Sequence, residues 1–331
     1  MKVCIYGAGA IGGWIGVKLA EAGAQVSVVA RGATLDALAS HGLRLVEGEG
    51  QEAEPRAVAV RASDDPAALG PQDLVVVAVK APALASVAGR IAPLLGPDTT
   101  VLTAMNGVPW WFCDGLGPAF AGKRLASVDP DGAIAAAIPA RQTVGCVVHA
   151  SCMLDAPGVV RNRQGRGLIL GEASGQPSER VRALAAMFAG AGFDAKASDR
   201  IQQDVWYKLW GNMTMNPISA LTGATSDRIL GDELVRDFVT AVMLEAKAIG
   251  ERCGITIDQA PADRLAVTLR LGAMKTSMLQ DVEAGRPVEL DALVAAVREL
   301  GQITAVPTPF TNALLGLARV QAQRLGLYPR A

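Results

Sequence analysis

Residues 2–31, KVCIYGAGAIGGWIGVKLAEAGAQVSVVAR, decide the fold of this chain. An apolar segment of the kind that forms a strand runs into G-A-G-A-I-G, then into an amphipathic helical pattern and a second apolar strand that ends before Arg31. A glycine motif set in this order of elements is typical of a unit that binds a dinucleotide. The alternative is a glycine-rich turn in an unrelated α/β protein.

The expected cofactor-binding loop consists of six consecutive residues, Gly7, Ala8, Gly9, Ala10, Ile11 and Gly12. Gly7 allows a tight turn, Gly9 lets the backbone approach a pyrophosphate, and Gly12 lets the helix pack against the strand. The pyrophosphate is expected on the free N–H groups at the start of the helix. Arg31 stands where an NAD-binding unit carries Asp or Glu for the ribose 2′-hydroxyl. A guanidinium suits a 2′-phosphate instead, so the sequence favours NADP(H) over the alternative of a solvent-facing arginine.

The composition limits the class of protein. The chain has 331 residues, half of them hydrophobic, which predicts two domains with sizeable cores. Lys and Arg number 31 against 32 Asp and Glu, which argues against a general nucleic-acid-binding surface. No apolar run reaches the roughly eighteen residues of a membrane span, and the N-terminus enters a strand rather than a signal peptide. We therefore expect a cytoplasmic protein, with neither nucleic acid nor membrane as partner.

Cysteine and histidine usage predicts neither disulfides nor a metal site. The five cysteines are scattered without C-x-x-C spacing, and the only histidines are His41 and His149. Scattered cysteines in odd number fit reduced, mostly buried thiols. Because histidine is scarce and His149 lies in an expected strand, where we interpret it as structural, the general acid is expected to be Lys, Glu or Asp.

The alternation of strands and helices continues to about residue 198. The expected elements are strands at 42–46, 57–60, 74–79, 100–104 and 143–151, a hairpin-like pair at 158–161 and 167–171, and helices at 84–95 and 179–191. This alternation predicts an α/β domain over residues 1–198, Rossmann-like, with a doubly wound and mostly parallel sheet.

From residue 199 the pattern becomes helical. Helices are expected at 199–215, 227–253, 260–282, 289–303 and 308–324. This predicts an all-α domain over residues 199–331, which we expect to carry the substrate and the catalytic groups.

Two polar residues directly follow buried strands of the expected sheet. Lys80 comes after the apolar run at 74–79, and Asn106 comes after the strand at 100–104. In open α/β sheets, ligands bind outside the carboxyl ends of the strands, where the strand order reverses. Lys80 and Asn106 are therefore candidates for the same site as the Gly7 turn. The alternative is that both residues simply face water.

Lys208, Asn212 and Asn216 are spaced by four and so share one helical face, among large apolar neighbours. Pro217 disfavours helical geometry at Asn216, so we expect the helix to end or kink there. Burial would move the pKa of Lys208 toward neutrality, which makes it the best candidate for a general acid that protonates a reduced carbonyl. The alternative is a polar stripe that faces solvent.

Ser277 is expected inside a helix, and Glu289 at the start of the next one, after a Gly-Arg-Pro break. Both residues have ordinary structural explanations. A helix-opening Glu matches the helix dipole, and a mid-helix Ser often bonds its own i−4 carbonyl.

Together these features resemble the ketopantoate reductase (2-dehydropantoate 2-reductase) family. The resemblance rests on the glycine loop with Arg31, Val79-Lys80-Ala, Asn106-Gly107, Lys208-x-x-x-Asn-x-x-x-Asn-Pro217, Ser277-Met-Leu-Gln-Asp and Glu289-Leu-Asp. It covers nearly the whole chain, and the motif from Lys208 to Pro217 and the Ser277-Met-Leu-Gln-Asp motif are much more specific than the glycine loop. It implies reduction of ketopantoate to pantoate with NADPH, in pantothenate and coenzyme A synthesis.

The resemblance also implies roles for single residues. Lys208 would be the general acid, Asn106 would lie near the nicotinamide and the substrate, and Lys80 would lie near the cofactor. On the substrate side, Asn212 and Asn216 would bind the hydroxyl end of the substrate, and Ser277 its carboxylate. Glu289 would hydrogen-bond cofactor or substrate and help to bring the two domains together.

Two alternatives in function and one in assembly stay open. The chain could reduce another branched small 2-oxo acid, because a fold does not decide its substrate. It could also be a non-catalytic NADP-binding sensor or scaffold, although the presence of Lys208 argues against this.

Trp110 and Trp111, in an excursion at 108–131, could cap the pocket or only anchor a loop. The helical half is compatible with a homodimer, because an apolar helix serves equally as core or interface.

Overall fold

The computed structural model describes residues 1–48, 54–270 and 272–329. By contact, the chain divides into two compact units. The sheet unit contains Met1–Met105 and Gly132–Ile201, and the helical unit contains Asn106–Asp131 and Gln202–Ala331. The segment Asn106–Asp131 thus packs with helices from much later in the chain, whereas we expected it within a continuous first domain.

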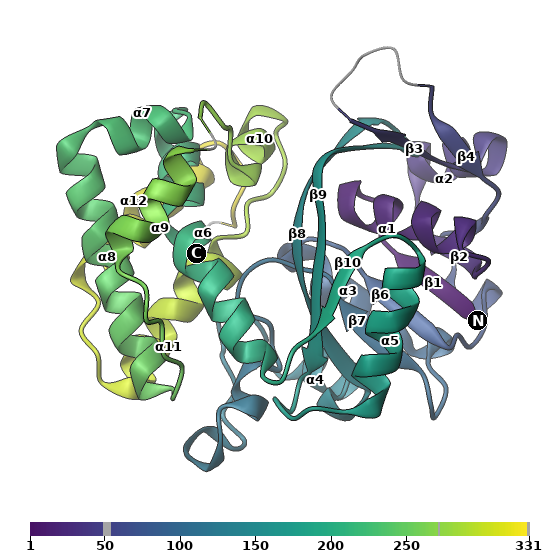
Figure 1. Ribbon diagram of the computed structural model, residues 1–331, viewed down its shortest axis with the longest axis horizontal. Helices are drawn as coiled ribbons and strands as arrows, with labels where there is room; N and C mark the ends of the chain where they lie inside the picture. Colours follow the sequence, from purple (N-terminus) through teal and green to yellow (C-terminus); the bar gives the residue numbers. More distant parts are fainter. Residues whose placement is uncertain (49–53, 271, 330–331) are drawn as a thin grey trace. The chain divides into compact units, whose positions relative to one another are not determined.

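Ten strands form one mixed sheet in the part of the chain that the structure describes. They are β1 (Lys2–Tyr6), β2 (Gln25–Val29), β3 (Leu43–Glu47), β4 (Arg56–Val58), β5 (Arg61–Ser63), β6 (Leu74–Val77), β7 (Thr100–Thr103), β8 (Thr143–Ala156), β9 (Val159–Glu172) and β10 (Asp194–Ala197). Their order is β4-β3-β9-β8-β7-β6-β1-β2-β5, with β10 paired to β9 (Figure 1). Paired strands are parallel except for β8 with β9 and β3 with β4, which confirms the mostly parallel sheet.

The direction in which strands are added reverses at β1. The chain adds β2 and then β5 on one side of β1, and later returns to add β6 and β7 on the other side. β1 is parallel to both β2 and β6, so the carboxyl ends of these three strands share one edge. This is the doubly wound topology, with its switch point at the ends of β1 and β6.

Helix α1 (Ala10–Glu21) is enclosed by the sheet unit instead of lying on one face of it. A Cβ on Gly13 would lie 2.4 Å from Cγ2 of Val160 in β9, and one on Gly16 would lie 2.8 Å from Cδ2 of Leu43 in β3. Gly16 also contacts Ile5 of β1. Because strands cover α1 on more than one side, residues 12–17 are all buried, and the helix has glycine where the strands come closest.

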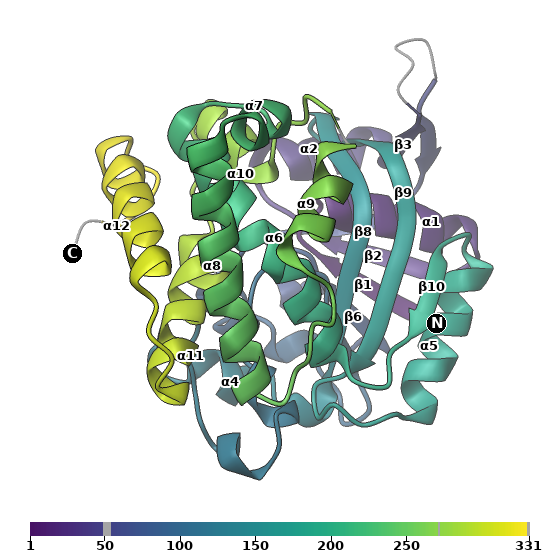
Figure 2. The ribbon, with the colours of Figure 1, turned by 60° about the vertical axis from the view of Figure 1, so that its left-hand side comes forward.

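The hairpin predicted between 158–161 and 167–171 is wrong. Residues 159–161 and 167–171 both belong to the single strand β9, which pairs antiparallel with β8 from Val144↔Glu172 to Ala156↔Val159 (Figure 2). Residues 163–166, which separate the two stretches, are exposed strand residues. The turn lies instead at Gly158, whose φ of +70° favours glycine.

The helices of the sheet unit after α1 are α2 (Gly32–His41), α3 (Leu84–Ala88), α4 (Ala133–Ala137) and α5 (Glu179–Gly190). The helical unit is built from α6 (Ile201–Thr222), α7 (Ser226–Gly231), α8 (Glu233–Arg252), α9 (Pro261–Leu269), α10 (Ser277–Glu283), a π-helical turn (Asp291–Ala295), α11 (Ala296–Thr304) and α12 (Pro309–Arg324). An all-helical C-terminal region is thereby confirmed. None of the described helices is long and apolar enough to cross a membrane.

Helix α6 is anchored to α8 by two buried tryptophans. The indole N–H of Trp206 donates to the carbonyl of Ala246 at 3.3 Å, and that of Trp210 donates to the carbonyl of Met243 at 2.7 Å. We predicted that this helix ends or kinks at Asn216; an end there is wrong, because α6 continues through Pro217 to Thr222. Burial of the residues that follow Pro217 offsets the backbone hydrogen bond that proline removes.

Four other predicted helices are interrupted. The helix expected at 227–253 is divided at Asp232 into α7 and α8. The helix expected at 84–95 is α3 followed by a 3₁₀ turn (Ala92–Leu94), and the helix expected at 260–282 is divided into α9 and α10. The helix expected at 289–303 opens with the π-helical turn before it becomes α11. Short 3₁₀ and π segments have no periodicity of their own over so few residues, so a 3.6-residue pattern does not reveal them.

Candidate active site

The glycine loop lies at the switch point of the sheet. Gly7 has a φ of +100°, and a Cβ on it would lie 2.7 Å from Cγ1 of Val79, just past the end of β6. A Cβ on Gly12 would lie 2.1 Å from the carbonyl oxygen of Gly7, so α1 packs directly on the turn. The structure therefore confirms the tight turn at Gly7 and the packing contact at Gly12, and it places Lys80 beyond β6 at the same edge.

Gly9 differs from the other two motif glycines because neither its backbone dihedrals nor a close contact within the sheet unit requires glycine at this position. Its φ is −74°, which any residue adopts, and the nearest atom to a Cβ there is the carbonyl oxygen of Ala78 at 4.0 Å. The start of α1 at Ala10 has no side-chain cap and no acidic residue in its first turn. Open space beside uncapped N–H groups fits a pyrophosphate that approaches the backbone closely.

Arg31 follows β2 at the same edge of the sheet. It is exposed, occupies the N-cap position of α2, and makes no hydrogen bond or ion pair with the described residues. Burial raises the pKa of Tyr6, at the end of β1, while the guanidinium groups of Arg90 and Arg31 act in the opposite direction. Two cations thus lie near the end of β1, which favours an anionic ligand there.

In the helical unit, the side chains of Lys208 and Asn106 meet. Lys208 Nζ donates to Asn106 Oδ1 at 2.9 Å, although the two residues are 102 positions apart in the sequence. Both side chains are half-buried. The Asn106 oxygen that accepts from the ammonium helps to fix the position of Lys208 Nζ.

The backbone next to Asn106 is attached to the π-helical turn. The N–H of Val108 donates to the carbonyl of Ala292 at 2.8 Å. Gly107 has a φ of +83°, and a Cβ on it would lie 2.6 Å from the Cβ of Ala292. Glu289 is buried two residues before the π-helical turn begins, and its carbonyl accepts the N–H of Leu293. π-Helical turns occur frequently at functional sites, and this one connects the Asn106 and Glu289 segments.

Lys208, Asn212 and Asn216 lie on α6 at the predicted four-residue spacing. Asn216 is only 5% exposed, and Asn212 is half-buried. Among the described residues, neither amide side chain makes a hydrogen bond. Buried amides normally have partners, so these two are available to a ligand.

Ser277 is the first residue of α10, where the hydroxyl of Thr276 accepts the N–H of Leu279 as the cap. Ser277 is helical, as predicted, but it begins α10 instead of lying in the middle of a longer helix, and its side chain is exposed. Trp110 and Trp111 are buried in the helical unit, and neighbouring Phe112 stacks on Trp206 with ring centroids 5.7 Å apart. Burial of the two tryptophans supports the loop-anchor interpretation over a pocket cap.

Sequence reasoning missed how the Asn106–Asp131 segment is held. The carboxylate of Glu299, in α11, accepts the N–H groups of Ala126 at 2.7 Å and Ser127 at 2.8 Å. The large apolar residues at 110–112 were the available signal, because aromatic clusters in a loop need a core to bury them.

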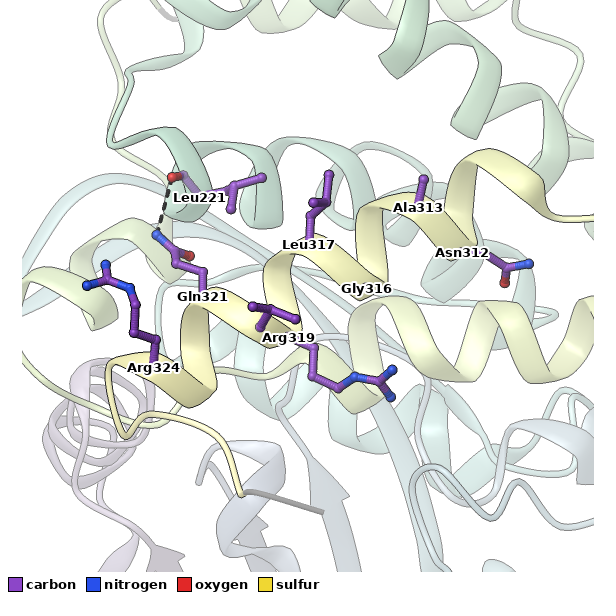
Figure 3. Close-up of a pocket in the computed structure, with 9 residues that line it drawn as sticks. Leu221, Asn312, Ala313, Gly316, Leu317, Arg319, Gln321 and Arg324 are labelled. Carbon is purple, nitrogen blue, oxygen red and sulfur yellow. Dashed lines mark hydrogen bonds between the residues drawn. The ribbon is translucent and has the colours of Figure 1, made fainter.

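A groove of about 750 Å³ runs along α12 and contains none of the predicted site residues (Figure 3). Its lining residues include Leu221, Ala313, Gly316, Leu317 and Val320. Within the described ranges, no group of three or more His, Cys, Asp or Glu residues is arranged to hold a metal ion. Each unit therefore carries a candidate region of its own: the glycine loop in the sheet unit and the Lys208 cluster in the helical unit.

Two family models match most of the chain. Residues 3–175 match the model described as "Ketopantoate reductase PanE/ApbA", and residues 200–322 match "Ketopantoate reductase PanE/ApbA C terminal". The second match begins at residue 200, directly before α6.

Known proteins agree with these models over the full length. A 2-dehydropantoate 2-reductase from Mesorhizobium japonicum is 47% identical over 99% of this chain and 100% of its own. A crystal structure of a Ralstonia solanacearum protein assigned as a ketopantoate reductase is 57% identical, with a TM-score of 0.94 over 99% of both chains. A dimeric ketopantoate reductase from Staphylococcus aureus shares the fold at 20% identity, with a TM-score of 0.74 over 98% of this chain and 100% of that one. The chain belongs to the ketopantoate reductase family.

Proposed function

We propose that this protein reduces 2-dehydropantoate (ketopantoate) to (R)-pantoate with NADPH, a step of pantothenate and coenzyme A synthesis. Family membership supports the reaction over the whole chain. The observation that carries the proposal is the Lys208–Asn106 hydrogen bond of 2.9 Å, beside two amides without protein partners in the described chain. A hydroxylated 2-oxo acid requires a proton donor for its carbonyl oxygen and hydrogen-bonding groups for its hydroxyl end, and α6 carries candidates for both.

The reaction needs a hydride at the carbonyl carbon and a proton at the carbonyl oxygen. A nicotinamide held by the glycine loop would supply the hydride. Lys208 Nζ gives the proton and stabilises the negative charge that develops on the oxygen. Asn106 holds Nζ in position, Asn212 and Asn216 bind the hydroxyl end of the substrate, and Ser277 donates to its carboxylate. In this proposal Lys80 and Glu289 bind the cofactor, and Glu289 is also in reach of the substrate.

The chain binds a nicotinamide dinucleotide, and we propose that it prefers NADP(H). Support comes from Arg31, which has no protein partner in the described chain, at the uncapped start of α2. A 2′-phosphate would accept hydrogen bonds from the guanidinium and lie at the positive end of the helix. An NAD-specific site would carry a carboxylate at this position.

The direct test is NADPH oxidation by the purified protein with ketopantoate and a panel of branched 2-oxo acids, followed by chiral analysis of the product. We expect the highest kcat/KM for ketopantoate and (R)-pantoate as product. A higher kcat/KM for another 2-oxo acid would reassign the substrate. NADPH binding without oxidation of any acid would favour the sensor or scaffold alternative.

We also propose a cytoplasmic homodimer that uses the groove along α12. Leu317 is 59% exposed and Val320 66% exposed on this one helix face. Two large apolar side chains beside Gly316 form a surface that a second copy could cover about a two-fold axis. Sedimentation of the wild type and of Leu317→Asp tests this. A wild type that sediments as a monomer would contradict it.

A further inference from the structure

Arg264 is a cation that no group in the described chain neutralises. It lies on α9, is half-buried, and makes no hydrogen bond or ion pair through its guanidinium with any described residue. Its Nε is fully enclosed and has no acceptor. A guanidinium stays charged at any physiological pH, so burying its Nε without a hydrogen-bond acceptor is unfavourable. This indicates that a ligand supplies the anion.

Gly211 of α6 makes room for this side chain. A Cβ on Gly211 would lie 3.1 Å from Nη2 and 3.4 Å from Cζ of Arg264, so the guanidinium lies against bare helix backbone. The ring centroid of Tyr207 is 5.6 Å from the same Cζ. Tyr207 is itself positioned, because its hydroxyl donates to Oε1 of Gln259 at 2.8 Å. The guanidinium is thus held in place by two groups that carry no charge.

The position of Gly211 puts the guanidinium beside the candidate active site. Gly211 lies three residues after Lys208 and directly before Asn212. Residues i and i+3 of an α-helix are surface neighbours, about 4.5 Å apart along the axis. Arg264 therefore lies along the flank of the stripe that contains Lys208 and Asn212.

We propose that Arg264 binds the carboxylate of the 2-oxo acid substrate, an inference that rests on the proposed function. In a 2-oxo acid the carboxylate is bonded directly to the carbonyl carbon, so an anchor for it belongs next to the proton donor Lys208. The planar guanidinium matches a carboxylate with two parallel hydrogen bonds. The two oxygens of the carboxylate can accept hydrogen bonds from Arg264 and Ser277 at the same time.

The test compares Arg264→Gln with the wild type on two substrates, ketopantoate and its neutral carboxamide. Hydrogen bonds to charged groups support a loss of about 10- to 100-fold in kcat/KM for the acid, mainly through KM. The carboxamide should be reduced equally well by both proteins. Arg264→Lys should recover part of the lost kcat/KM, because lysine keeps the positive charge but lacks the two parallel N–H donors of the guanidinium. Arg270 is an exposed arginine just past the end of α9, so Arg270→Gln is the matched control and should leave kcat/KM unchanged for both substrates.

A second variant tests the same idea without removing the arginine. Gly211→Ala places a methyl group against the guanidinium, while alanine favours the helix more than glycine does. We expect a smaller, acid-selective rise in KM with no loss of thermal stability. If Arg264→Gln does not fold, this variant still decides the question.

Equal losses on acid and carboxamide would overturn the proposal, because they would assign Arg264 a packing role. Unchanged kinetics on the acid would overturn it as well. Failure of the proposed function looks different, since the wild type would then not reduce ketopantoate at all. In that case calorimetric titration of the acid and the carboxamide into wild type and Arg264→Gln, with NADP⁺ present, gives the same comparison. Absence of acid-selective binding there would refute the role of Arg264.

Discussion

The two units hold their candidate residues in different ways. In the sheet unit the glycine loop is continuous in sequence, and its main features are backbone features: a φ of +100° at Gly7 and the uncapped start of α1. In the helical unit the corresponding features are side chains from distant segments, such as Asn106 and Lys208, 102 positions apart. A site built from backbone groups restricts the residue types at a few consecutive positions. A site built from side chains depends on the packing that brings distant segments together.

This contrast separates two kinds of sensitivity. A substitution in the glycine loop acts by adding atoms, because the loop works through the absence of side chains. A substitution in the helical unit acts by removing a group that carries charge or a hydrogen bond. The effects should therefore appear in cofactor affinity for the first unit and in turnover or substrate affinity for the second.

Lys208→Ala should give the largest effect. Loss of a positioned general acid lowers turnover by about 10²- to 10⁴-fold, and the NADPH dissociation constant should stay within about twofold. The measurements are steady-state kinetics and NADPH fluorescence titration. Lys275→Ala, an exposed lysine of the helical unit paired with Glu283, is the control. Normal turnover in Lys208→Ala would remove Lys208 from the chemistry.

Gly9→Ala and Gly12→Ala should separate binding from folding within one motif. A methyl group on Gly12 meets the Gly7 carbonyl at 2.1 Å, so overpacking should cost about 1–3 kcal/mol in the free energy of unfolding. On Gly9 the nearest atom is 4.0 Å away, so stability should hold while NADPH affinity falls by about 10- to 100-fold. Urea unfolding and NADPH titration check the pair. A Gly9→Ala protein with normal NADPH affinity would show that no ligand approaches there.

Arg31→Asp should weaken NADPH binding by about 10- to 30-fold, because it removes a charged hydrogen bond to the 2′-phosphate. NADH binding should change little, since NADH has no 2′-phosphate. Arg182→Asp, an exposed arginine of α5 outside the proposed site, should affect neither cofactor. Equal losses for NADPH and NADH would place Arg31 away from the 2′-phosphate.

Glu299→Gln should lower stability by about 1–3 kcal/mol without changing NADPH affinity, because a carboxylate that accepts two backbone N–H groups is replaced by a neutral amide. Denaturant unfolding measures this. The same variant tests whether the Asn106 segment depends on its attachment to α11, in which case kcat should fall as well. An unchanged midpoint would mean that the loop is held by its aromatic residues alone.

Asp291→Asn should give the smallest effect, visible only in the pH dependence of stability. Burial raises the pKa of the Asp291 carboxyl, partly opposed by the hydrogen bond from Tyr328. The native state then binds this proton more tightly than the unfolded chain does, so its contribution to stability rises as the pH falls through the native pKa. Asp291→Asn should flatten that rise. An identical pH profile in both proteins would contradict this assignment.

The fold of the sheet unit was largely predictable because its information is local. Strand, glycine loop and helix follow one another within 2–31, and the β-branched run of β6 identifies a buried parallel strand. The long β8–β9 pair was not predictable in this way. Its exposed middle residues look like a turn, and only pairing with β8 over the full length keeps them extended.

The candidate site in the helical unit was predictable by resemblance more than by physics. Periodicity places Lys208, Asn212 and Asn216 on one face, but nothing local indicates that Asn106 reaches Lys208. Arg264 was not identified either, because its significance depends on what is missing around it. The lack of a partner for a charged side chain can be recognised only when the positions of the surrounding residues are known.

The π-helical turn at Asp291–Ala295 holds one residue more than an α-helical turn would. Removing a single residue there would restore regular α-helical winding and leave the two ends of the helix in nearly the same relative orientation, because the π-helical turn is what accommodates the extra residue. The carbonyl of Ala292 would then bond within its own helix instead of reaching Val108. A one-residue insertion or deletion at this point is therefore enough to gain or lose the link between Asn106 and the Glu289 segment, which makes it a small evolutionary step with a large functional result.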